Sequence, residues 1–465
     1  MIKKLSRNEF EDAIKKGLGR AALHAQHYGL EGIDDIMLNA CLHDLSYDPQ
    51  CSDERAQWPQ GMIKNSSFYD DFVKKIALAL EQAADDDESH DCKQICELLA
   101  EMGQQGDNHA AQALRQKVYQ PKNALFWRKT DYWHFIEALI KLDGVKAYVW
   151  FAEQLGTAIL SHEEDADAIK SIFWHAEIIL YKDNEIREKA FFQLQQFKDS
   201  NPAIAAFIKH EQTFHRPVYK QCNPPTSDEK RWQRGRTRML KKTSLQKILD
   251  ADVRPARNGF HLDCALFGQF ALSEELEAIY QKLINETDEK LYNIWICVFS
   301  RAPLPRLHPR IWEMAFSSNN DLRQNTLLAL SQVDAPSVGK FVRKIIRSKN
   351  TLPLPYKVIQ LFTLNYEQGD EKLILETLQN SSFDTDDDLH RLSGDIADIL
   401  KNNDAPALFK LALWFYETTP CEVCRLYAVE WMVDQKLLPE HIRQECLHDT
   451  NEEIRRIAFS YPCID

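Results

Sequence analysis

The fold is decided by the stretch Asn320-Asp321-Leu322-Arg323-Gln324-Asn325-Thr326-Leu327-Leu328-Ala329-Leu330. Its opening, Asp321-Leu322-Arg323, has counterparts at intervals of about 31 to 35 residues. These are Pro355-Tyr356-Lys357, Asp388-Leu389-His390, Glu422-Val423-Cys424 and Glu453-Ile454-Arg455. Self-similarity at this period is typical of stacked helix pairs, because one pair alone cannot bury its apolar face. The last third of the chain is therefore predicted to consist of helical repeats.

Other parts of the repeat also recur. Residues 334–340 read Asp-Ala-Pro-Ser-Val-Gly-Lys, and residues 404–410 read Asp-Ala-Pro-Ala-Leu-Phe-Lys. The stretch 184–194 aligns position by position with 320–330, which lies 136 residues later, or four steps of about 34. Residues 252–256 form a weaker copy that contains a proline. The repeats are therefore expected to extend into the N-terminal half.

The openings of these repeats, in which an acidic residue, an aliphatic residue and arginine follow one another, resemble HEAT-like repeats, particularly the short kind found in bacterial proteins. In that family the acidic or asparagine residue caps the first helix, and the arginine lines the ladder between units. The resemblance is good over 319–465, fair over 184–211 and thin before that. It implies an all-α fold, a right-handed α-α superhelix or HEAT-like solenoid of stacked antiparallel helix pairs. It also implies a binding scaffold with a concave surface, but not its partner.

The composition agrees with a helical globular protein. The 465 residues are 44% hydrophobic and 27% charged, and only 15 are glycine. The net charge of −13 argues against a surface that follows nucleic acid or an anionic membrane throughout. The first seven residues lack the apolar core of a secretory signal, and runs such as 294–299 are too short to span a bilayer. Eleven scattered cysteines are typical of reduced thiols, so we expect a cytoplasmic protein without a membrane partner.

Local signals predict the organisation of the N-terminal half. Ser6-Arg7-Asn8-Glu9 is a capping box, which predicts a helix as far as Tyr28-Gly29 and a second helix from about Gly32 to Leu45. Further helices are expected over about 68–84, 90–102, 108–118, 131–142, 144–160, 165–181 and 185–198. Consecutive prolines in 222–227 predict a linker. We therefore expect a divergent N-terminal helical-repeat region at 1–221, a proline-containing basic linker or insert at 222–258, and a C-terminal HEAT-like region at 259–465.

The strongest chemical anomaly is a basic segment at 230–242, where seven of thirteen residues are cations. Arginine holds phosphate in a bidentate fork, and a tryptophan can stack on a base. On a helix, Arg231, Arg234, Arg238 and Lys241 would share one face. The candidate residues for binding phosphate or an acidic partner are Lys230, Arg231, Trp232, Arg234, Arg236, Arg238, Lys241 and Lys242. The alternative is a solvated segment that pairs with acidic loops of the same chain.

Four residues near the N-terminus suggest a metal site. His24 and His27 lie one helical turn apart, and His43-Asp44 follows. This arrangement resembles the HD phosphohydrolases, in which such residues hold a divalent metal that activates water. The gap of 16 to 19 residues is short for that family, and no distant aspartate stands out. Histidines on a helix surface and a capping Asp44 explain the same residues.

Three further patterns are explained by structure. Residues 126–135 contain five aromatics and two cations that could stack nucleobases, but Tyr132, Phe135 and Leu139 have the spacing of a core stripe. Cys421 and Cys424 form a CxxC motif with a potentially reactive Cys421, at a point where a repeat begins a helix. The aspartates at 384–388 lack the glycine that an EF-hand needs at its sixth position and fit a loop between helices.

The sequence contains no GxSxG, P-loop, dinucleotide-binding or HExxH motif, so neither catalytic residues nor a cofactor are predicted. The expected function is a non-catalytic scaffold or adaptor that binds a protein partner on a concave helical surface. The first alternative is a nucleic-acid-binding protein that uses residues 230–242. The second alternative is a metal-dependent HD-type phosphohydrolase.

Overall fold

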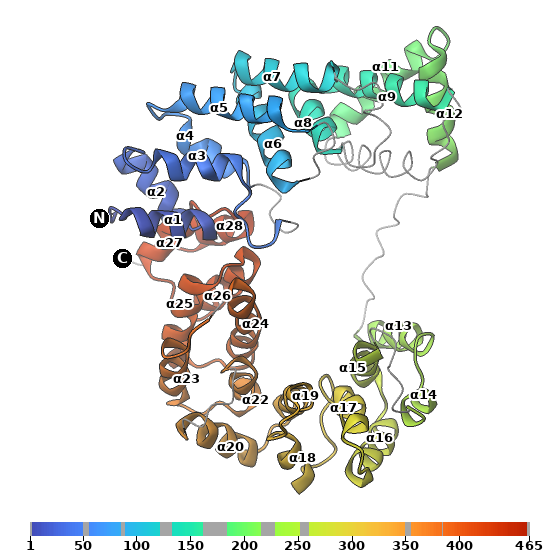
Figure 1. Cartoon of the computed structure of the whole chain (residues 1–465), viewed down its shortest axis with the longest axis vertical. Coiled ribbons are helices and arrows are strands. Elements are labelled where there is room, and N and C mark those ends of the chain that lie inside the picture. The colour runs from blue at the N-terminus through green and yellow to red at the C-terminus, as the bar shows by residue number, and fades with distance from the viewer. Residues whose placement is uncertain are drawn as a thin grey trace. The chain divides into compact units, whose positions relative to one another are not determined.

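A computed structural model describes residues 2–49, 55–84, 89–120, 133–160, 184–214, 228–251, 260–348, 355–383 and 385–462. Regular secondary structure in these ranges is entirely helical (Figure 1). The predicted all-α class is thereby confirmed. Within the same ranges, no helix combines the length and apolar character that crossing a membrane requires.

The chain divides into two compact units. The first comprises Met1–Tyr219 together with Pro439–Asp465, and the second comprises Lys220–Leu438. The described residues from Pro439 to residue 462 are therefore grouped with the N-terminal helices.

In the first unit, each helix packs on its sequence neighbour or on the next but one. Thus α3 contacts α1 and α5, α6 contacts α4 and α8, and α9 contacts α12. The C-terminal α27 packs against α2. The helices are α1 (Arg7–Lys16), α2 (Gly19–Tyr28), α3 (Asp34–Leu42), α4 (Gln57–Ile63), α5 (Tyr69–Gln82), α6 (His90–Gln104), α7 (Asn108–Tyr119), α8 (Trp133–Asp143), α9 (Val145–Leu160), α11 (Asn184–Phe197), α12 (Pro202–Phe214), α27 (Glu440–Cys446) and α28 (Glu452–Ser460).

The second unit has the same alternation. One row of contacts runs from α13 to α15, α17 and α19, and further along α24 packs on α26; a second row joins α14 to α16 and α23 to α25. The helices are α13 (Asp228–Leu240), α14 (Leu245–Leu249), α15 (Phe260–Phe270), α16 (Ser273–Asn285), α17 (Glu289–Val298), α18 (Pro309–Met314), α19 (Asn320–Ser331), α20 (Pro336–Arg347), α21 (Pro355–Ile359), α22 (Phe362–Asn365), α23 (Asp370–Gln379), α24 (Asp386–Asn402), the short 3₁₀ helix η3 (Pro406–Leu408), α25 (Phe409–Thr418) and α26 (Glu422–Asp434).

The five repeat openings coincide with helix starts. The helices α19, α21, α24, α26 and α28 each begin within two residues of the predicted opening. Asn319 and Asn451 cap α19 and α28 through their side-chain oxygens. In the same two repeats, the Nη1 atoms of Arg323 and Arg455 donate to backbone carbonyls six residues earlier, at 2.8 Å each. The repeated arginine therefore fastens each helix start to the loop before it.

The predicted first helix is wrong in its extent. The capping box at Ser6 and Glu9 is present, but the helix ends at Gly17, and α2 begins only two residues later. Gly17 adopts a left-handed φ of 73°, and its N–H bonds back to Ala13 and Ile14. Because glycine adopts this conformation without a steric penalty, Gly17 acts as a C-cap that the apolar periodicity concealed.

The other predicted helices agree more closely with the structure. The helix predicted from about Gly32 to Leu45 is α3, which ends at Leu42 because the chain at His43 is extended. Those expected over 68–84, 90–102, 108–118, 131–142, 144–160 and 185–198 are confirmed with small shifts as α5, α6, α7, α8, α9 and α11. The helix expected at 165–181, the proline segment 222–227 and the weak repeat at 252–256 lie outside the described residues.

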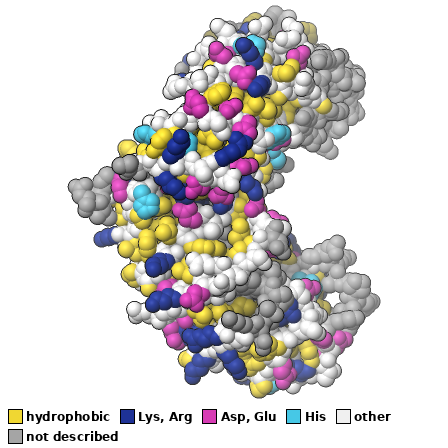
Figure 2. Space-filling model, turned by 60° about the vertical axis from the view of Figure 1, so that its left-hand side comes forward, with side chains coloured by type: hydrophobic (Ala, Val, Ile, Leu, Met, Phe, Trp, Pro, Cys, Tyr) yellow, Lys and Arg dark blue, Asp and Glu magenta, His cyan; other side chains and the backbone are white. Residues whose placement is uncertain are grey.

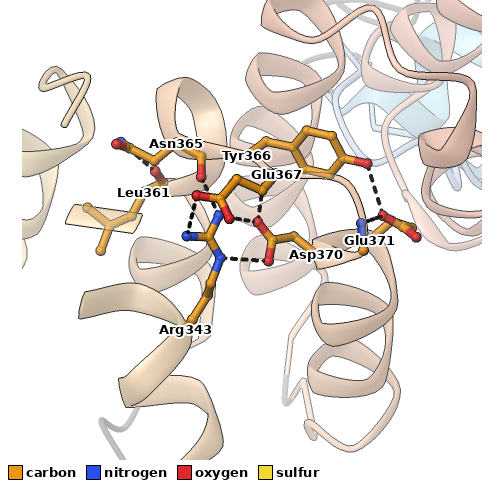
Figure 3. A network of polar contacts seen from close by, with 8 residues as sticks. Arg343, Leu361, Asn365, Tyr366, Glu367, Asp370 and Glu371 are labelled. Carbon is orange, nitrogen blue, oxygen red and sulfur yellow. Dashed lines mark hydrogen bonds and ion pairs between the residues drawn. The ribbon is translucent and has the colours of Figure 1, made fainter. Parts of the chain in front are cut away.

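A polar network joins α20 to α22 and α23 (Figure 3). The Arg343 guanidinium donates to both carboxylate oxygens of Asp370, at 2.8 and 2.6 Å, and to the carbonyl of Asn365. Asn365 in turn accepts from the Ala335 N–H and donates to the Val333 carbonyl. Both partners of the Arg343–Asp370 pair are largely buried, with 12% and 6% of their side chains exposed. One arginine thus binds the end of one helix pair to the start of the next.

Candidate functional site

The basic segment forms the first helix of the second unit, and its two faces differ in chemistry. The inner face of α13 carries Trp232, Gly235, Arg236 and Met239, the i, i+3, i+4, i+7 spacing of a packed helix face. Met239 is buried. A Cβ atom on Gly235 would lie 2.3 Å from the Phe270 ring, so glycine permits the close approach of α15. This packing fixes which cations of the segment face outward.

One of the predicted binding residues, Arg236, instead fastens α13 to α15 and α16. The Arg236 guanidinium donates to both carboxylate oxygens of Glu275, each at 2.8 Å, and to the Phe270 carbonyl at 2.6 Å. It also lies over the Trp232 ring, 5.7 Å from the centroid. Burial alone would raise the pKa of Glu275, but the hydrogen bonds from Arg236 and the Leu272 N–H lower it. Arg236 is therefore paired with an acidic residue of the same chain, and Trp232 lies against it.

The outer face of α13 is a shallow groove lined by Lys230, Gln233, Arg234, Thr237, Arg238 and Lys241. We call its four cations, Lys230, Arg234, Arg238 and Lys241, the α13 basic face. All four are exposed. Within the described part of the chain, Arg234, Arg238 and Lys241 make no side-chain ion pair. Lys242 lies just beyond the helix and is exposed, and the side chain of Arg231 lies outside the described residues.

A second basic face was not predicted from the sequence. Lys340, Lys344 and Arg347 project from α20 around a shallow hollow that also includes Arg343. Arg343 is committed to Asp370, which leaves three outward cations. Their spacing of four and three residues was a signal available in the sequence. On the face shown in Figure 2, lysine and arginine side chains lie in several places beside aspartate and glutamate.

The histidines of the possible metal site do not converge. His24 is buried between Phe10 and Tyr28, and its Nδ1 accepts a hydrogen bond of 2.9 Å from the Leu5 N–H. Burial, and then the charge of Lys4, lower the pKa of His24. The exposed His27 lies one turn further along α2. His24 is thus a core histidine with its Nδ1 already occupied.

His43 and Asp44 both form hydrogen bonds with Asp91 instead. The His43 Nδ1 and the Asp44 N–H each lie 2.7 Å from a carboxylate oxygen of Asp91. Asp44 accepts from the N–H and the hydroxyl of Ser46. In the described ranges, these residues do not belong to any group of three metal-capable side chains whose ligand atoms lie within 4.8 Å of one another.

Such a group does exist in the second unit, around the CxxC motif. The ligand atoms of His390, Cys421 and Cys424 all lie within 4.8 Å of one another, and the Cys424 Sγ is 3.6 Å from the His390 Nδ1. Cys421 is the N-cap of α26, as the repeat predicts. The pKa of Cys421 is lowered to about 6, chiefly by the Cys424 side chain and then, against the effect of burial, by the N–H groups of Cys424 and Val423. His390, which lies 31 residues before Cys421 in the sequence, was not predicted to lie beside this motif.

The remaining patterns are structural where they are described. Phe135 is fully buried, as expected for a core stripe, whereas residues 126–132 lie outside the described residues. Thr385 caps α24, and Asp386, Asp387 and Asp388 occupy the first turn of that helix. Carboxylates at a helix N-terminus stabilise it, so these three aspartates belong to the start of a helix rather than to the loop before it.

Comparison with known proteins gives no relative for this chain. No protein family model matches it, and neither a curated protein nor a solved structure matches it significantly.

Proposed function

We propose that the chain is a non-catalytic scaffold, a HEAT-like solenoid, that binds an acidic or phosphorylated segment of a partner protein along the α13 basic face. The order of helix contacts within each unit supports the solenoid, because helices contact their next-but-one neighbours in two rows. Extended surfaces of stacked helices suit the binding of other macromolecules.

The observation that carries the proposal is that the cations of α13 have two different environments. One arginine, Arg236, is neutralised by Glu275, while Arg234, Arg238 and Lys241 remain outside on successive turns. Gathering these like charges on one helix costs free energy through repulsion. An anionic ligand that bridges these turns would relieve this repulsion and form charge-assisted hydrogen bonds with the two arginines.

A peptide titration tests the proposal. The probe is a fluorescein-labelled peptide that contains phosphoserine and glutamate residues, and fluorescence anisotropy reports its binding. Reversing Arg234, Arg238 and Lys241 to glutamate is expected to weaken binding by at least about tenfold, since three charge-assisted contacts become repulsive. The matched control reverses Lys340, Lys344 and Arg347 on α20, which changes the net charge equally and should leave binding largely intact.

The same variants distinguish binding of a protein partner from the alternative, binding of nucleic acid. If the face binds duplex DNA through four phosphates, the logarithm of the affinity should fall with the logarithm of salt with a slope of about −3 to −4. Binding of the nucleic acid with that slope, together with no binding of the peptide, would replace the protein partner by nucleic acid. Equal loss in both triple variants would mean that net charge, and not the α13 basic face, governs binding.

A further inference from the structure

The CxxC motif and His390 come from neighbouring repeats. Cys421 caps α26, Cys424 lies in the first turn of that helix, and His390 lies near the start of α24, which packs on α26. Both cysteines are buried, with 4% and 9% exposed, whereas His390 is half-buried. The three side chains therefore form a cluster that solvent reaches from the side of His390.

The repeat explains why these side chains meet. His390 and Cys424 are 34 residues apart and occupy the third position of their repeat openings, where Arg323 and Arg455 stand in other copies. Those arginines reach back to loop carbonyls. Histidine and cysteine are too short for that contact, so their ligand atoms stay between α24 and α26. Replacement of arginine in two consecutive repeats thus places an imidazole beside a thiol.

The spacing of the cluster fits a tetrahedral metal. With Zn–S bonds of about 2.3 Å and Zn–N bonds of about 2.0–2.1 Å, two ligands of a tetrahedron lie about 3.6 Å apart for a sulfur and a nitrogen. The Cys424 Sγ and the His390 Nδ1 are separated by 3.6 Å. All three ligand atoms lie within 4.8 Å of one another, which places them around one common centre.

We propose that His390, Cys421 and Cys424 bind a thiophilic divalent cation, with Zn²⁺ preferred. Thiolate and imidazole ligands select zinc over magnesium, calcium or manganese, which favour oxygen. Three protein ligands leave the fourth tetrahedral position to a water molecule. Because the ligand sulfurs must be thiolates, binding releases any thiol proton still present, and affinity falls at acidic pH.

Cobalt titration of the reduced, full-length chain without a histidine tag tests this site. Tetrahedral Co²⁺ bound to thiolates gives a charge-transfer absorption that a site made only of oxygen and nitrogen lacks. We expect one Co²⁺ per chain with this absorption, and its displacement by Zn²⁺. The substitutions Cys421→Ser, Cys424→Ser and His390→Asn should each weaken binding by more than about tenfold, since losing even an outer-shell partner costs about that much.

A second thiol and imidazole pair in the same unit provides the control. The Cys297 Sγ lies 3.5 Å from the His261 Nδ1, between α17 and α15, but within the described residues this pair belongs to no three-ligand group. Cys297→Ser should therefore leave the cobalt titration unchanged. The Cys297–His261 pair tests whether one cysteine close to one histidine is sufficient to bind the metal.

If a serine variant fails to fold, alkylation of the wild-type chain tests whether Cys421 and Cys424 bind Zn²⁺. Zn²⁺ should protect Cys421 and Cys424 from iodoacetamide, as read by peptide mass spectrometry, without changing the labelling of Cys297. The proposal is overturned if the reduced wild type shows no thiolate-cobalt absorption, or if that absorption survives Cys421→Ser. It is also overturned if Cys421 and Cys424 form a disulfide as isolated and, once reduced, are not protected by Zn²⁺.

Discussion

Arg343 shows how one side chain can hold two repeats together. It projects from α20 among exposed cations, yet its guanidinium is held by Asp370 and by the Asn365 carbonyl (Figure 3). The same helix face thus contains one structural cation and three that face solvent. Composition alone cannot separate these roles, because both kinds of cation stand at helical spacing.

Removing this side chain should destabilise the second unit. Arg343→Ala leaves the buried Asp370 carboxylate without its cation, which costs about 3 kcal/mol of unfolding free energy. Arg347→Ala, on the exposed part of the same helix, should change stability by less than about 0.5 kcal/mol. Urea denaturation of both variants measures the difference. Equal stability of the two would show that the Arg343–Asp370 pair contributes little net free energy.

Asp395 couples the stability of the second unit to pH. Its carboxyl is buried, and Lys357 approaches only to 4.0 Å. Burial raises its pKa from 3.8 to about 7, partly opposed by Lys357. Because the folded state holds this proton more tightly than the unfolded state, the contribution to stability is complete below about pH 4. It is lost as pH rises to about 7.

Substitution by a neutral amide should remove this dependence. Relative to the wild type, Asp395→Asn is expected to gain stability between about pH 4 and pH 7, by about 4 kcal/mol in total, and to keep that gain above pH 7. Chemical denaturation at a series of pH values measures it. Asp387→Asn, an exposed change at the start of the same helix, serves as control. A constant difference between Asp395→Asn and wild type across this range would mean that the Asp395 carboxyl titrates normally.

Two glycines near the break between α1 and α2 have different structural roles. Gly17 supplies the left-handed cap, whereas Gly19 allows α27 to approach. A Cβ atom on Gly19 would lie 1.8 Å from the Glu445 carbonyl oxygen. Around this contact, the Arg20 Nε bonds to the Glu445 carboxylate at 2.9 Å, and the Thr450 N–H bonds to the Gly17 carbonyl. Close backbone approach therefore positions the C-terminal helices.

A methyl group at this point should loosen the contact between α2 and α27. Gly19→Ala forces the backbones apart, and we expect it to destabilise the first unit by about 2 kcal/mol, in the range of overpacking in a core. Hydrogen exchange should then accelerate in 440–460. Gly61→Ala is the matched control, because open space surrounds its Cβ position within α4 and alanine favours a helix. Protection of α27 that is unchanged in Gly19→Ala would contradict this explanation.

The two ends of the chain belong to one compact unit. Residues 439–465 pack with the N-terminal helices, and the Trp58 Nε1 donates to the His448 carbonyl at 2.8 Å. Contacts so distant in sequence form only after most of the chain has been synthesised, so the first unit is completed last.

Truncation tests this dependence. A chain that ends at Leu438 should lose hydrogen-exchange protection in α1 and α2, because their contacts with α27 and the 448–450 segment are removed. Protection in α15 to α19 of the second unit should remain close to that of the full chain. Loss of protection in both units alike would show that they unfold as one cooperative body.

The sequence by itself determined the helical class and the positions of most helices, including the five repeat openings. These depend on local periodicity and caps, which a sequence contains in full. It also indicated the basic segment at 230–242.

Only the tertiary structure decided which side chains meet. It assigned Arg236 to Glu275 and left Arg234, Arg238 and Lys241 on the outer face of α13. It buried His24, and it brought His390 to the CxxC motif across one repeat. It also grouped residues 439–465 in one compact unit with the N-terminal helices. The physical reason is that local periodicity fixes the face on which a residue stands, whereas packing between distant segments fixes what lies opposite that face.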